Sequence, residues 1–559
     1  MTYGPRNERL TERNQDNKQW TYTYDALIRL ATQTNPPGTG AGPGGGPVVR
    51  TLSYDPVGRL ESVEFNTGRI NSLGYDDNNN VRFLTRTRPG QPTTTLQLDY
   101  DAMDRLTESR DTFSKTVRYG YDALSRVVTK TYPGGKILTH SYDKLSRLTA
   151  LAFTGVAVPC TFAYDDAGRL TQRTYPNGIT QTNTFDDAGR IETLGYAGSA
   201  TPPIALAYAY DRNGNKTGGT ENGTLAWQKT SLADYDETAA FKPDGKLISR
   251  TDALSPRDFT YAYDDAGNLT TATSGSESYA LTYDEDNRTT AITWDMGLTD
   301  KVIANRYDAL GRRVSRTLDG TETRYILDLM GGMERILCDT DAAGVIKAWY
   351  IHGPDLCFKV TDTGALTCYH ADAQGNIVRT TNASGATVNQ CAYTPFGRAI
   401  DTTPSAITDT SDPYRFVGSQ GVMLEFPTIA SSNLYFMRAR YYSAEAAVFF
   451  ATDPVKNIGA GWKPDAYGYG FSNPLRFSDP EGERSKESQA RIIASLQESA
   501  AYAAEAAAWA EAEVNILQGV SDALDTTLSL LTGDAKGIAT GLAKQTAGLL
   551  DATGHASVG

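Results

Sequence analysis

Aromatic and aliphatic residues alternate with small or polar ones along roughly the first three hundred positions of this chain. The clearest example is residues 161–170, where Phe and Tyr alternate with Thr and Ala ahead of the sequence Asp-Asp-Ala-Gly-Arg. A period of two is typical of a half-buried strand, and Asp-x-x-Gly fits a type I turn. We therefore predict a β-hairpin in which Asp165 binds the turn backbone, Gly168 takes a positive φ and Arg169 reaches a neighbouring carboxylate.

Near copies of this hairpin recur along the sequence. Between Tyr100 and Phe185 they follow one another roughly every 21 residues, which is enough for two strands and two turns. A β-propeller would need equal blades of about 42 residues, and the uneven spacing of the copies favours a continuous ribbon instead. The Tyr-Asp or Phe-Asp pairs that mark the copies begin at Tyr24, Tyr54, Tyr75, Tyr100, Tyr121, Tyr142, Tyr164, Phe185, Tyr210, Tyr263, Tyr283 and Tyr307.

A second set of motifs follows the repeats. It consists of Leu-Tyr-Phe-Met-Arg-Ala-Arg-Tyr-Tyr at 434–442, Phe-Phe-Ala-Thr-Asp-Pro at 449–454, Tyr-Gly-Tyr-Gly-Phe-Ser-Asn-Pro at 467–474 and Asp-Pro-Glu-Gly at 479–482. Together with the Tyr-Asp repeats, this set resembles the core box of the YD-repeat, or Rhs-repeat, family. Members of that family occur in bacterial toxin complexes, polymorphic Rhs effectors and animal teneurins.

The resemblance implies an all-β fold, in which a spiral ribbon of YD-repeat β-hairpins forms a hollow shell. In the bacterial members the shell encloses a C-terminal toxin segment. We accordingly divide the chain into a shell at 1–432, a core box at 433–483 and a short α-helical tail at 484–559. Because the tyrosines of successive hairpins fall on one face of the ribbon, we expect their rings to line it and to stack on one another.

The same resemblance assigns a self-cleavage reaction to Arg440, Asp453 and Asp479, with the cleaved bond between Glu483 and Arg484. The residue types suit this chemistry. Two adjacent carboxylates cannot both ionise readily, so one can activate a water molecule while the other protonates the scissile carbonyl. A nearby guanidinium stabilises the anionic partner. Bacterial relatives carry Leu at the position of Glu483, so here the cleavage site contains a third acid.

Composition changes abruptly after residue 483, to Ala, Glu, Gln and Leu with apolar residues near helical spacing. This tail fits either the start of a variable toxin region or a helical plug packed against the shell. Its glycine and leucine pattern near residues 537–550 also fits membrane-seeking helices. Lys536, Lys544 and Asp551 interrupt that pattern, so we predict no stable membrane insertion.

The net charge and the numbers of cysteines and histidines limit which molecules the chain is expected to bind. A net charge of −13 argues against a nucleic-acid-binding surface. Five cysteines without CxxC spacing and four histidines suggest neither a metal site nor a cofactor. His370 and Asp372 could be a catalytic or metal pair, but a hydrogen-bonded structural histidine is the better interpretation. The N-terminus lacks the apolar region of a signal peptide, so we expect synthesis in the cytoplasm and export by an injection apparatus.

These observations favour a toxin-encapsulating shell that sequesters its own C-terminal segment for delivery and cleaves itself at the end of the core box. Its partners would be that segment and a secretion or injection apparatus. The alternative is a teneurin-like surface or adhesion scaffold with no enzymatic activity.

Overall fold

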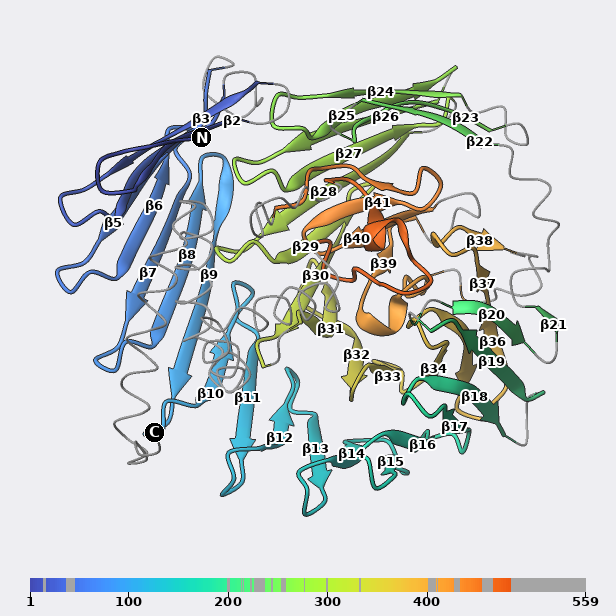
Figure 1. Ribbon diagram of the computed structural model, residues 1–559. Coiled ribbons are helices and arrows are strands. Elements are labelled where there is room, and N and C mark those ends of the chain that lie inside the picture. The colour runs from blue at the N-terminus through green and yellow to red at the C-terminus, as the bar shows by residue number, and fades with distance from the viewer. Residues whose placement is uncertain are drawn as a thin grey trace, which may run out of the picture.

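The computed structural model is a wall of antiparallel hairpins that curves around an inner segment of the same chain (Figure 1). It describes residues 1–13, 17–36, 46–198, 202–212, 214, 216–221, 224–225, 237–242, 245–252, 258–275, 277–297, 300–330, 333–400, 409, 411–426, 433–454 and 466–483. The expected helical tail, with Arg484, lies outside these residues. The described part contains only strands, turns and two short 3₁₀ helices.

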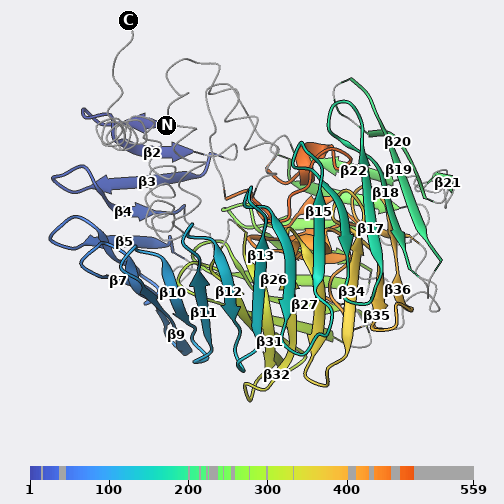
Figure 2. The same ribbon diagram turned by 90° about the horizontal axis from the view of Figure 1, so that it is seen from below.

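The first sheet has 21 strands. Each strand pairs in antiparallel fashion with the next along the chain, as a ribbon of hairpins requires (Figure 2). The strands are β1 (Thr2–Tyr3), β2 (Arg9–Arg13), β3 (Gln19–Tyr24), β4 (Leu30–Thr34), β5 (Val49–Tyr54), β6 (Leu60–Phe65), β7 (Ile70–Tyr75), β8 (Val81–Arg88), β9 (Gln91–Tyr100), β10 (Leu106–Arg110), β11 (Thr116–Tyr121), β12 (Val127–Thr131), β13 (Ile137–Tyr142), β14 (Leu148–Phe153), β15 (Cys160–Tyr164), β16 (Leu170–Thr174), β17 (Thr180–Phe185), β18 (Ile191–Ala197), β19 (Ile204–Tyr210), β20 (Lys216–Glu221) and β21 (Thr224–Leu225).

The second sheet has 15 strands and continues the same hairpin order. Its strands are β22 (Glu237–Phe241), β23 (Leu247–Asp252), β24 (Phe259–Tyr263), β25 (Leu269–Ser274), β26 (Glu277–Tyr283), β27 (Thr289–Asp295), β28 (Asp300–Tyr307), β29 (Arg313–Leu318), β30 (Thr321–Asp328), β31 (Arg335–Asp341), β32 (Ile346–His352), β33 (Leu356–Thr361), β34 (Leu366–Ala371), β35 (Ile377–Asn382) and β36 (Thr387–Gln390).

The turn between β15 and β16 shows how the repeat sequence forms its hairpin. Gly168 has a φ of +79° and donates its N–H to the Asp165 carbonyl at 3.0 Å. Arg169 donates its backbone N–H to one Asp165 carboxylate oxygen at 2.8 Å and its Nε to the other at 2.7 Å. These bonds, with that from the Arg169 backbone foremost, hold the pKa of Asp165 below its usual value. The register shift beside Tyr164 marks the bulge that accompanies a left-handed turn residue. The predicted hairpin is confirmed.

Replacing Gly168 by Val is expected to lower the free energy of unfolding by about 1–2 kcal/mol, because a β-branched residue must adopt the left-handed conformation there. A Cβ at this position would meet no atom within 4 Å, so the cost is conformational and the shell should still assemble. Ala167→Val is the matched control, since Ala167 lies exposed in the same turn. Urea unfolding of both variants measures the difference; an equal effect for the two would contradict the explanation.

Successive hairpins are joined by the repeat tyrosines. The hydroxyl of Tyr164 donates to the Leu148 carbonyl at 2.9 Å, and other repeat tyrosines make the same bond to the preceding hairpin. The Arg147 guanidinium lies 5.1 Å from the centre of the Tyr164 ring. Arginines of other repeat turns cover the next ring in the same way. Guanidinium-on-ring contacts therefore replace the ring-on-ring stacking that we predicted, because the ring face attracts a cation.

Phe185 has no hydroxyl and cannot make this bond. The side chain of Asn183, two residues earlier, donates to the Leu170 carbonyl at 2.9 Å instead. Strand residues two apart lie on the same face, so Asn183 can supply the missing donor from β17. The inter-hairpin bond is thus preserved where the repeat sequence departs from its pattern.

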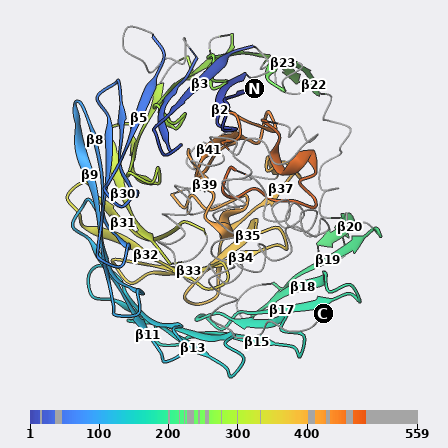
Figure 3. The same cartoon turned by 60° about the vertical axis from the view of Figure 1, so that its left-hand side comes forward.

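The second sheet packs against the first, so the ribbon is a spiral with overlapping turns (Figure 3). Residues of both sheets share one hydrophobic core. Tyr132 donates to the Tyr350 carbonyl at 3.1 Å, across 218 residues of sequence. Tyr196 donates to the Ala371 carbonyl at 2.6 Å, across 175 residues. One turn of the spiral therefore takes about two hundred residues. The all-β spiral shell predicted from the repeats is confirmed.

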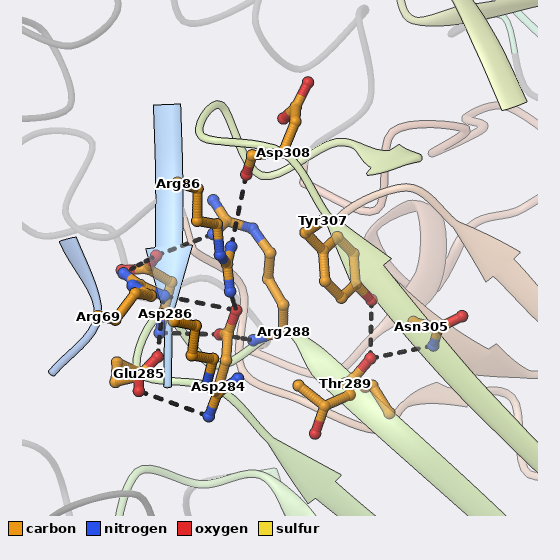
Figure 4. A network of polar contacts seen from close by, with 12 residues as sticks. Arg69, Arg86, Asp284, Glu285, Asp286, Arg288, Thr289, Asn305, Tyr307 and Asp308 are labelled. Carbon is orange, nitrogen blue, oxygen red and sulfur yellow. Dashed lines mark hydrogen bonds and ion pairs between the residues drawn. The ribbon is translucent and has the colours of Figure 1, made fainter. Parts of the chain in front are cut away.

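A buried cluster of charges also joins the two turns (Figure 4). Arg69, which precedes β7, lies 3.0 Å from Glu285 and 2.5 Å from Asp286. Arg86 on β8 lies 2.8 Å from Asp284. The three acids belong to the turn between β26 and β27. Their arginine partners come from a strand pair about two hundred residues earlier, so the cluster fixes the register of one ribbon turn on the other.

Regular ribbon pairing ends at Gln390, and the described residues from 392 to 483 form the inner segment. They lie within the curved wall (Figure 3), and Phe436 and Tyr441 pack with Trp294 of the second sheet. The described shell is therefore occupied on its concave side by its own chain. The elements of the inner segment are β37 (Ala392–Tyr393), β38 (Ala399–Ile400), η3 (Gly418–Gln420), β39 (Met423–Leu424), β40 (Leu434–Met437), β41 (Arg440–Ser443), β42 (Val448–Phe449) and η4 (Tyr469–Ser472).

Candidate functional site

The inner segment brings together the three residues that the core box assigns to self-cleavage. Arg440 opens β41, Asp453 follows β42 and Asp479 begins the Asp-Pro-Glu-Gly loop. The Arg440 Nη2 lies 3.1 Å from an oxygen of Asp453 and 3.3 Å from an oxygen of Asp479. All three side chains are buried. Two carboxyl groups thus share one guanidinium nitrogen away from solvent. They come from positions 13 and 39 residues after Arg440 in the sequence.

Arg440 is held rigidly. Its Nε donates to the Gly482 carbonyl, and its Nη1 donates to the Ala466 carbonyl at 3.0 Å. The guanidinium carbon lies 3.7 Å from the centre of the Phe449 ring. A buried guanidinium with this many acceptors and a ring beneath it cannot reorient at low cost. Arg440 is therefore a fixed cation at the centre of the site.

The residue before the predicted cleavage point lies within the site. The carbonyl oxygen of Glu483 accepts a hydrogen bond from Arg440 Nη2 at 3.4 Å. The backbone N–H of Glu483 donates to a carboxylate oxygen of Asp479 at 3.1 Å. This carbonyl is the one that cleavage before Arg484 would attack. Arg484 itself lies outside the described residues.

Gly482 sets the path of the chain into the site. Its φ is +64°, and a Cβ there would come within 2.2 Å of the Met437 carbonyl oxygen and 3.1 Å of the Arg440 nitrogen. In the same Asp-Pro-Glu-Gly loop, the Glu481 carbonyl accepts a hydrogen bond from the Ala439 N–H at 3.1 Å. Only glycine fits this close approach of the loop to the turn between β40 and β41.

Sequence reasoning missed Arg438. Its guanidinium donates to the Pro480 carbonyl, to the Glu334 carbonyl at 2.7 Å and to the Gln420 carbonyl at 2.6 Å. Arg438 thereby connects the Asp-Pro-Glu-Gly loop with the residue that precedes β31 of the second sheet. Its position two residues before Arg440 was visible in the motif, but no local pattern indicated that its three acceptors would meet.

Two acids in the site have raised pKa values. Burial raises the pKa of Asp479 to about 6; the Arg440 guanidinium opposes this rise and Asp453 adds to it. Burial raises the pKa of Glu483 to about 7, and Glu481, Asp453 and Asp479 push it in the same direction. At mildly acidic pH, Asp479 can therefore hold a proton within the site. Paired acid and base catalysis requires one carboxyl group in this state.

His370 and Asp372, the other polar pair that the sequence offered, form no catalytic or metal site among the described residues. His370 is buried, bonds Thr381 at 2.8 Å and is flanked edge-on by Tyr175 and Tyr196. Asp372 accepts from the Asn376 backbone at 2.9 Å, as the first residue of its own turn. His370 is thus the hydrogen-bonded structural histidine that we predicted. Within the described ranges, no three acidic, His or Cys side chains gather as metal ligands.

The fold and site define a class of protein: an all-β spiral shell of hairpin repeats whose inner segment carries a buried Arg–Asp–Asp cluster. Residues 100–137 and 243–279 match the family model named RHS Repeat. These two segments of the chain are therefore similar to RHS repeats.

Curated relatives cover parts of the chain. The tRNA nuclease WapA of Bacillus subtilis (strain 168) is 28% identical over 228 residues, which is 40% of this chain and 9% of that protein. The toxin protein Tse5 of Pseudomonas aeruginosa is 25% identical over 328 residues, 50% of this chain and 24% of that protein. The chain therefore spans less than a quarter of the length of either relative.

Solved structures share the fold. The Tc holotoxin pore of Photorhabdus luminescens with TccC3 superimposes with a TM-score of 0.53 at 13% identity, over 83% of this chain and 29% of that one. TcdB2–TccC3 without its hypervariable C-terminal region gives a TM-score of 0.51 at 13% identity, over 85% and 30%. In the part of the chain that the structure describes, no helix is both long and apolar enough to cross a membrane.

Proposed function

We propose that this chain is a toxin-encapsulating shell that sequesters its C-terminal segment and separates it by cutting its own backbone. In this proposal residues 1–432 form the shell, with its described residues from 392 onward lying inside the wall, residues 433–483 form the cleavage region, and residues 484–559 form the enclosed helical segment. The relative named as the toxin protein Tse5 supports the class, and the fold neighbour TcdB2–TccC3 is a protein with a hypervariable C-terminal region. A secretion or injection apparatus would carry the assembled shell out of the producing cell.

The observation that carries the cleavage proposal is the placement of the Glu483 carbonyl, 3.4 Å from the same Arg440 nitrogen that contacts Asp453 and Asp479. Asp479, with its raised pKa, holds the proton, and Asp453 accepts a proton from the attacking water. The water oxygen bonds to the carbonyl carbon while Arg440 stabilises the negative charge that develops on the carbonyl oxygen. The bond to the nitrogen of Arg484 then breaks as Asp453 gives that nitrogen the proton it took from the water. The amine leaves, and Asp479 ends with its own proton.

Asp453→Asn is expected to abolish cleavage, because the amide cannot accept the proton of the attacking water. A denaturing gel with intact mass of fresh protein is the measurement. The native chain should yield a fragment beginning at Arg484, and the variant should remain intact at 60.5 kDa. Asp165→Asn, the same substitution in a repeat turn, is the control and should cleave like the native chain. If the native chain and both variants all remain uncleaved, the result would favour the adhesion scaffold with no enzymatic activity.

A further inference from the structure

Tyr467 joins the inner segment to the wall. It opens the Tyr-Gly-Tyr-Gly-Phe-Ser-Asn-Pro motif at 467–474, which no step of the proposed cleavage uses. Its hydroxyl donates to the Gly267 carbonyl at 2.7 Å, in the turn between β24 and β25 of the second sheet. The buried ring packs with Leu247 of β23 and lies edge-on to Tyr263, with ring centres 5.7 Å apart. A residue of the core box is therefore anchored on the wall 200 residues earlier in the sequence.

The residue before Tyr467 holds two members of the cleavage site. The Ala466 carbonyl accepts from Arg440 Nη1 at 3.0 Å and from the backbone N–H of Asp453 at 3.0 Å. The position of this one acceptor therefore helps to set where the guanidinium and the Asp453 backbone lie relative to each other. Ala466 is joined by one peptide bond to Tyr467, whose own carbonyl accepts from the Phe449 N–H at 2.9 Å. Anchoring of Tyr467 on the wall thus restricts where the Ala466 carbonyl can lie.

The same turn of the wall also holds the strand that leads to Asp453. The first residue of β25 donates its backbone N–H to the Phe450 carbonyl at 2.7 Å. Gly267 leaves room for this contact: its φ is +90°, and a Cβ there would come within 2.6 Å of the Tyr467 hydroxyl oxygen and 2.7 Å of the Thr452 methyl carbon. Thr452 directly precedes Asp453. The β24–β25 turn therefore contacts the Asp453 strand directly and also through Tyr467.

We infer, on the basis of the proposed function, that Tyr467 is a positioning residue for self-cleavage and that the β24–β25 turn of the wall completes the cleavage site through it. Tyr467 acts through the Ala466 carbonyl, which binds both Arg440 and the Asp453 backbone. A shift of that carbonyl moves the two groups relative to each other, and a misplacement of about 1 Å can slow a reaction about a hundredfold. The site is then complete only where the second sheet covers the inner segment, so cleavage is coupled to assembly of the wall.

Tyr467→Phe removes only the hydroxyl that binds the wall. In the full-length chain it should slow the appearance of the fragment beginning at Arg484 about fivefold, because a buried hydrogen bond is lost and the carbonyl beside it can shift. Tyr435→Phe is the matched control, since Tyr435 is a buried tyrosine of the inner segment whose hydroxyl donates to the Gly397 carbonyl at 3.1 Å. The control should cleave at the native rate. Equal slowing in both variants would overturn the inference.

Gly267→Ala disturbs the same contact from the wall. Its methyl group would press on Tyr467 and Thr452, so cleavage should slow about tenfold or more. Gly168→Ala is the matched control, because it places alanine at a similar positive φ where a Cβ meets no atom within 4 Å. It should cleave at the native rate. Equal rates for the two alanine variants would contradict a role for the β24–β25 turn in the site.

The pH dependence separates displacement of Asp453 from a general loss of stability. The Asp453 carboxylate contributes to the raised pKa values of both Asp479 and Glu483. If Gly267→Ala moves Asp453 away, both pKa values fall, and the decline of the cleavage rate with rising pH should begin at lower pH than in the native chain. Loss of stability alone would reduce the amount of fragment without moving this decline. A slowed variant with the native pH profile would therefore overturn the inference.

Hydrogen exchange tests the positioning without relying on cleavage. The backbone N–H of Asp453 donates to the Ala466 carbonyl, so its exchange should be faster in Tyr467→Phe than in the native chain and in Tyr435→Phe. A native chain that never cleaves would refute the proposed function and the effect on its rate, while faster exchange would still support the hold of the wall on Asp453. Unchanged exchange in a chain that does cleave would overturn this inference alone.

Discussion

Glu483→Leu is expected to raise the rate of self-cleavage at pH 8 by about tenfold or more, which corresponds to about 1.4 kcal/mol of barrier. The pKa of Glu483 is raised to about 7, so this side chain is ionised at pH 8. It then adds a negative charge beside the carboxyl pair, in which the reaction requires Asp479 to be protonated, and this charge opposes the negative charge that develops on the scissile carbonyl. Leucine removes the charge and the cost of burying it. Appearance of the fragment beginning at Arg484, followed over time by denaturing gel, measures the rate.

Glu483→Gln is the matched control because it removes the charge and keeps the shape. If charge is the obstacle, Gln should accelerate cleavage nearly as much as Leu. If the pocket requires an apolar side chain, only Leu should do so. A rate unchanged in both variants would contradict the assignment of Glu483 to the cleavage site.

The pH dependence provides a second check on the same residue. Native cleavage should slow as pH rises through about 7, where Glu483 ionises, and the Leu variant should keep only the dependence on Asp479 near pH 6. The free energy of unfolding should also fall as pH rises through about 7. Both acids have folded pKa values above their ordinary ones, so the folded chain binds extra protons between about pH 4 and 7. Their contribution to stability is therefore complete in acid and is lost as pH rises through 7.

Local signals predicted the hairpin, and family motifs singled out Arg440, Asp453 and Asp479, whose side chains the fold brings together. The Asp165 to Arg169 turn could be read directly because all its bonds lie within five residues. The ring stacking was wrong because alternation places tyrosines on one face but does not indicate that an arginine of the preceding turn covers each ring.

Contacts between ribbon turns could not be predicted. Arg69 meets Asp286 across 217 residues, and nothing near either residue marks the other as its partner. The same holds for Arg438, whose acceptor Glu334 lies 104 residues away. The register of one turn on the next depends on the summed twist and length of all the hairpins between them, which a sequence pattern does not specify.

Arg69→Met is expected to lower the free energy of unfolding by about 3–5 kcal/mol, because it leaves buried carboxylates without their cation. Arg69 is fully buried and contacts Glu285 and Asp286. Burial alone would raise the pKa of Asp286, yet Arg69 and Arg288 hold it below its usual value. The stability that this carboxylate contributes is therefore present above its unfolded pKa and is lost only in strong acid. Removing Arg69 should also shift the start of acid unfolding to higher pH.

Arg118→Met is the matched control. Arg118 pairs with Glu108 at 2.8 Å, but its side chain is 58% exposed, so the same substitution there should cost less than about 1 kcal/mol. Urea unfolding of both variants at pH 7 measures the difference, and added salt should weaken only the Arg118 pair, because buried charges are screened far less. Equal losses would mean that the buried cluster does not hold the two turns in register. A loss of stability only in Arg69→Met, together with faster proteolysis of the second sheet, would show that contacts between the two ribbon turns stabilise the wall more than this ion pair within one turn does.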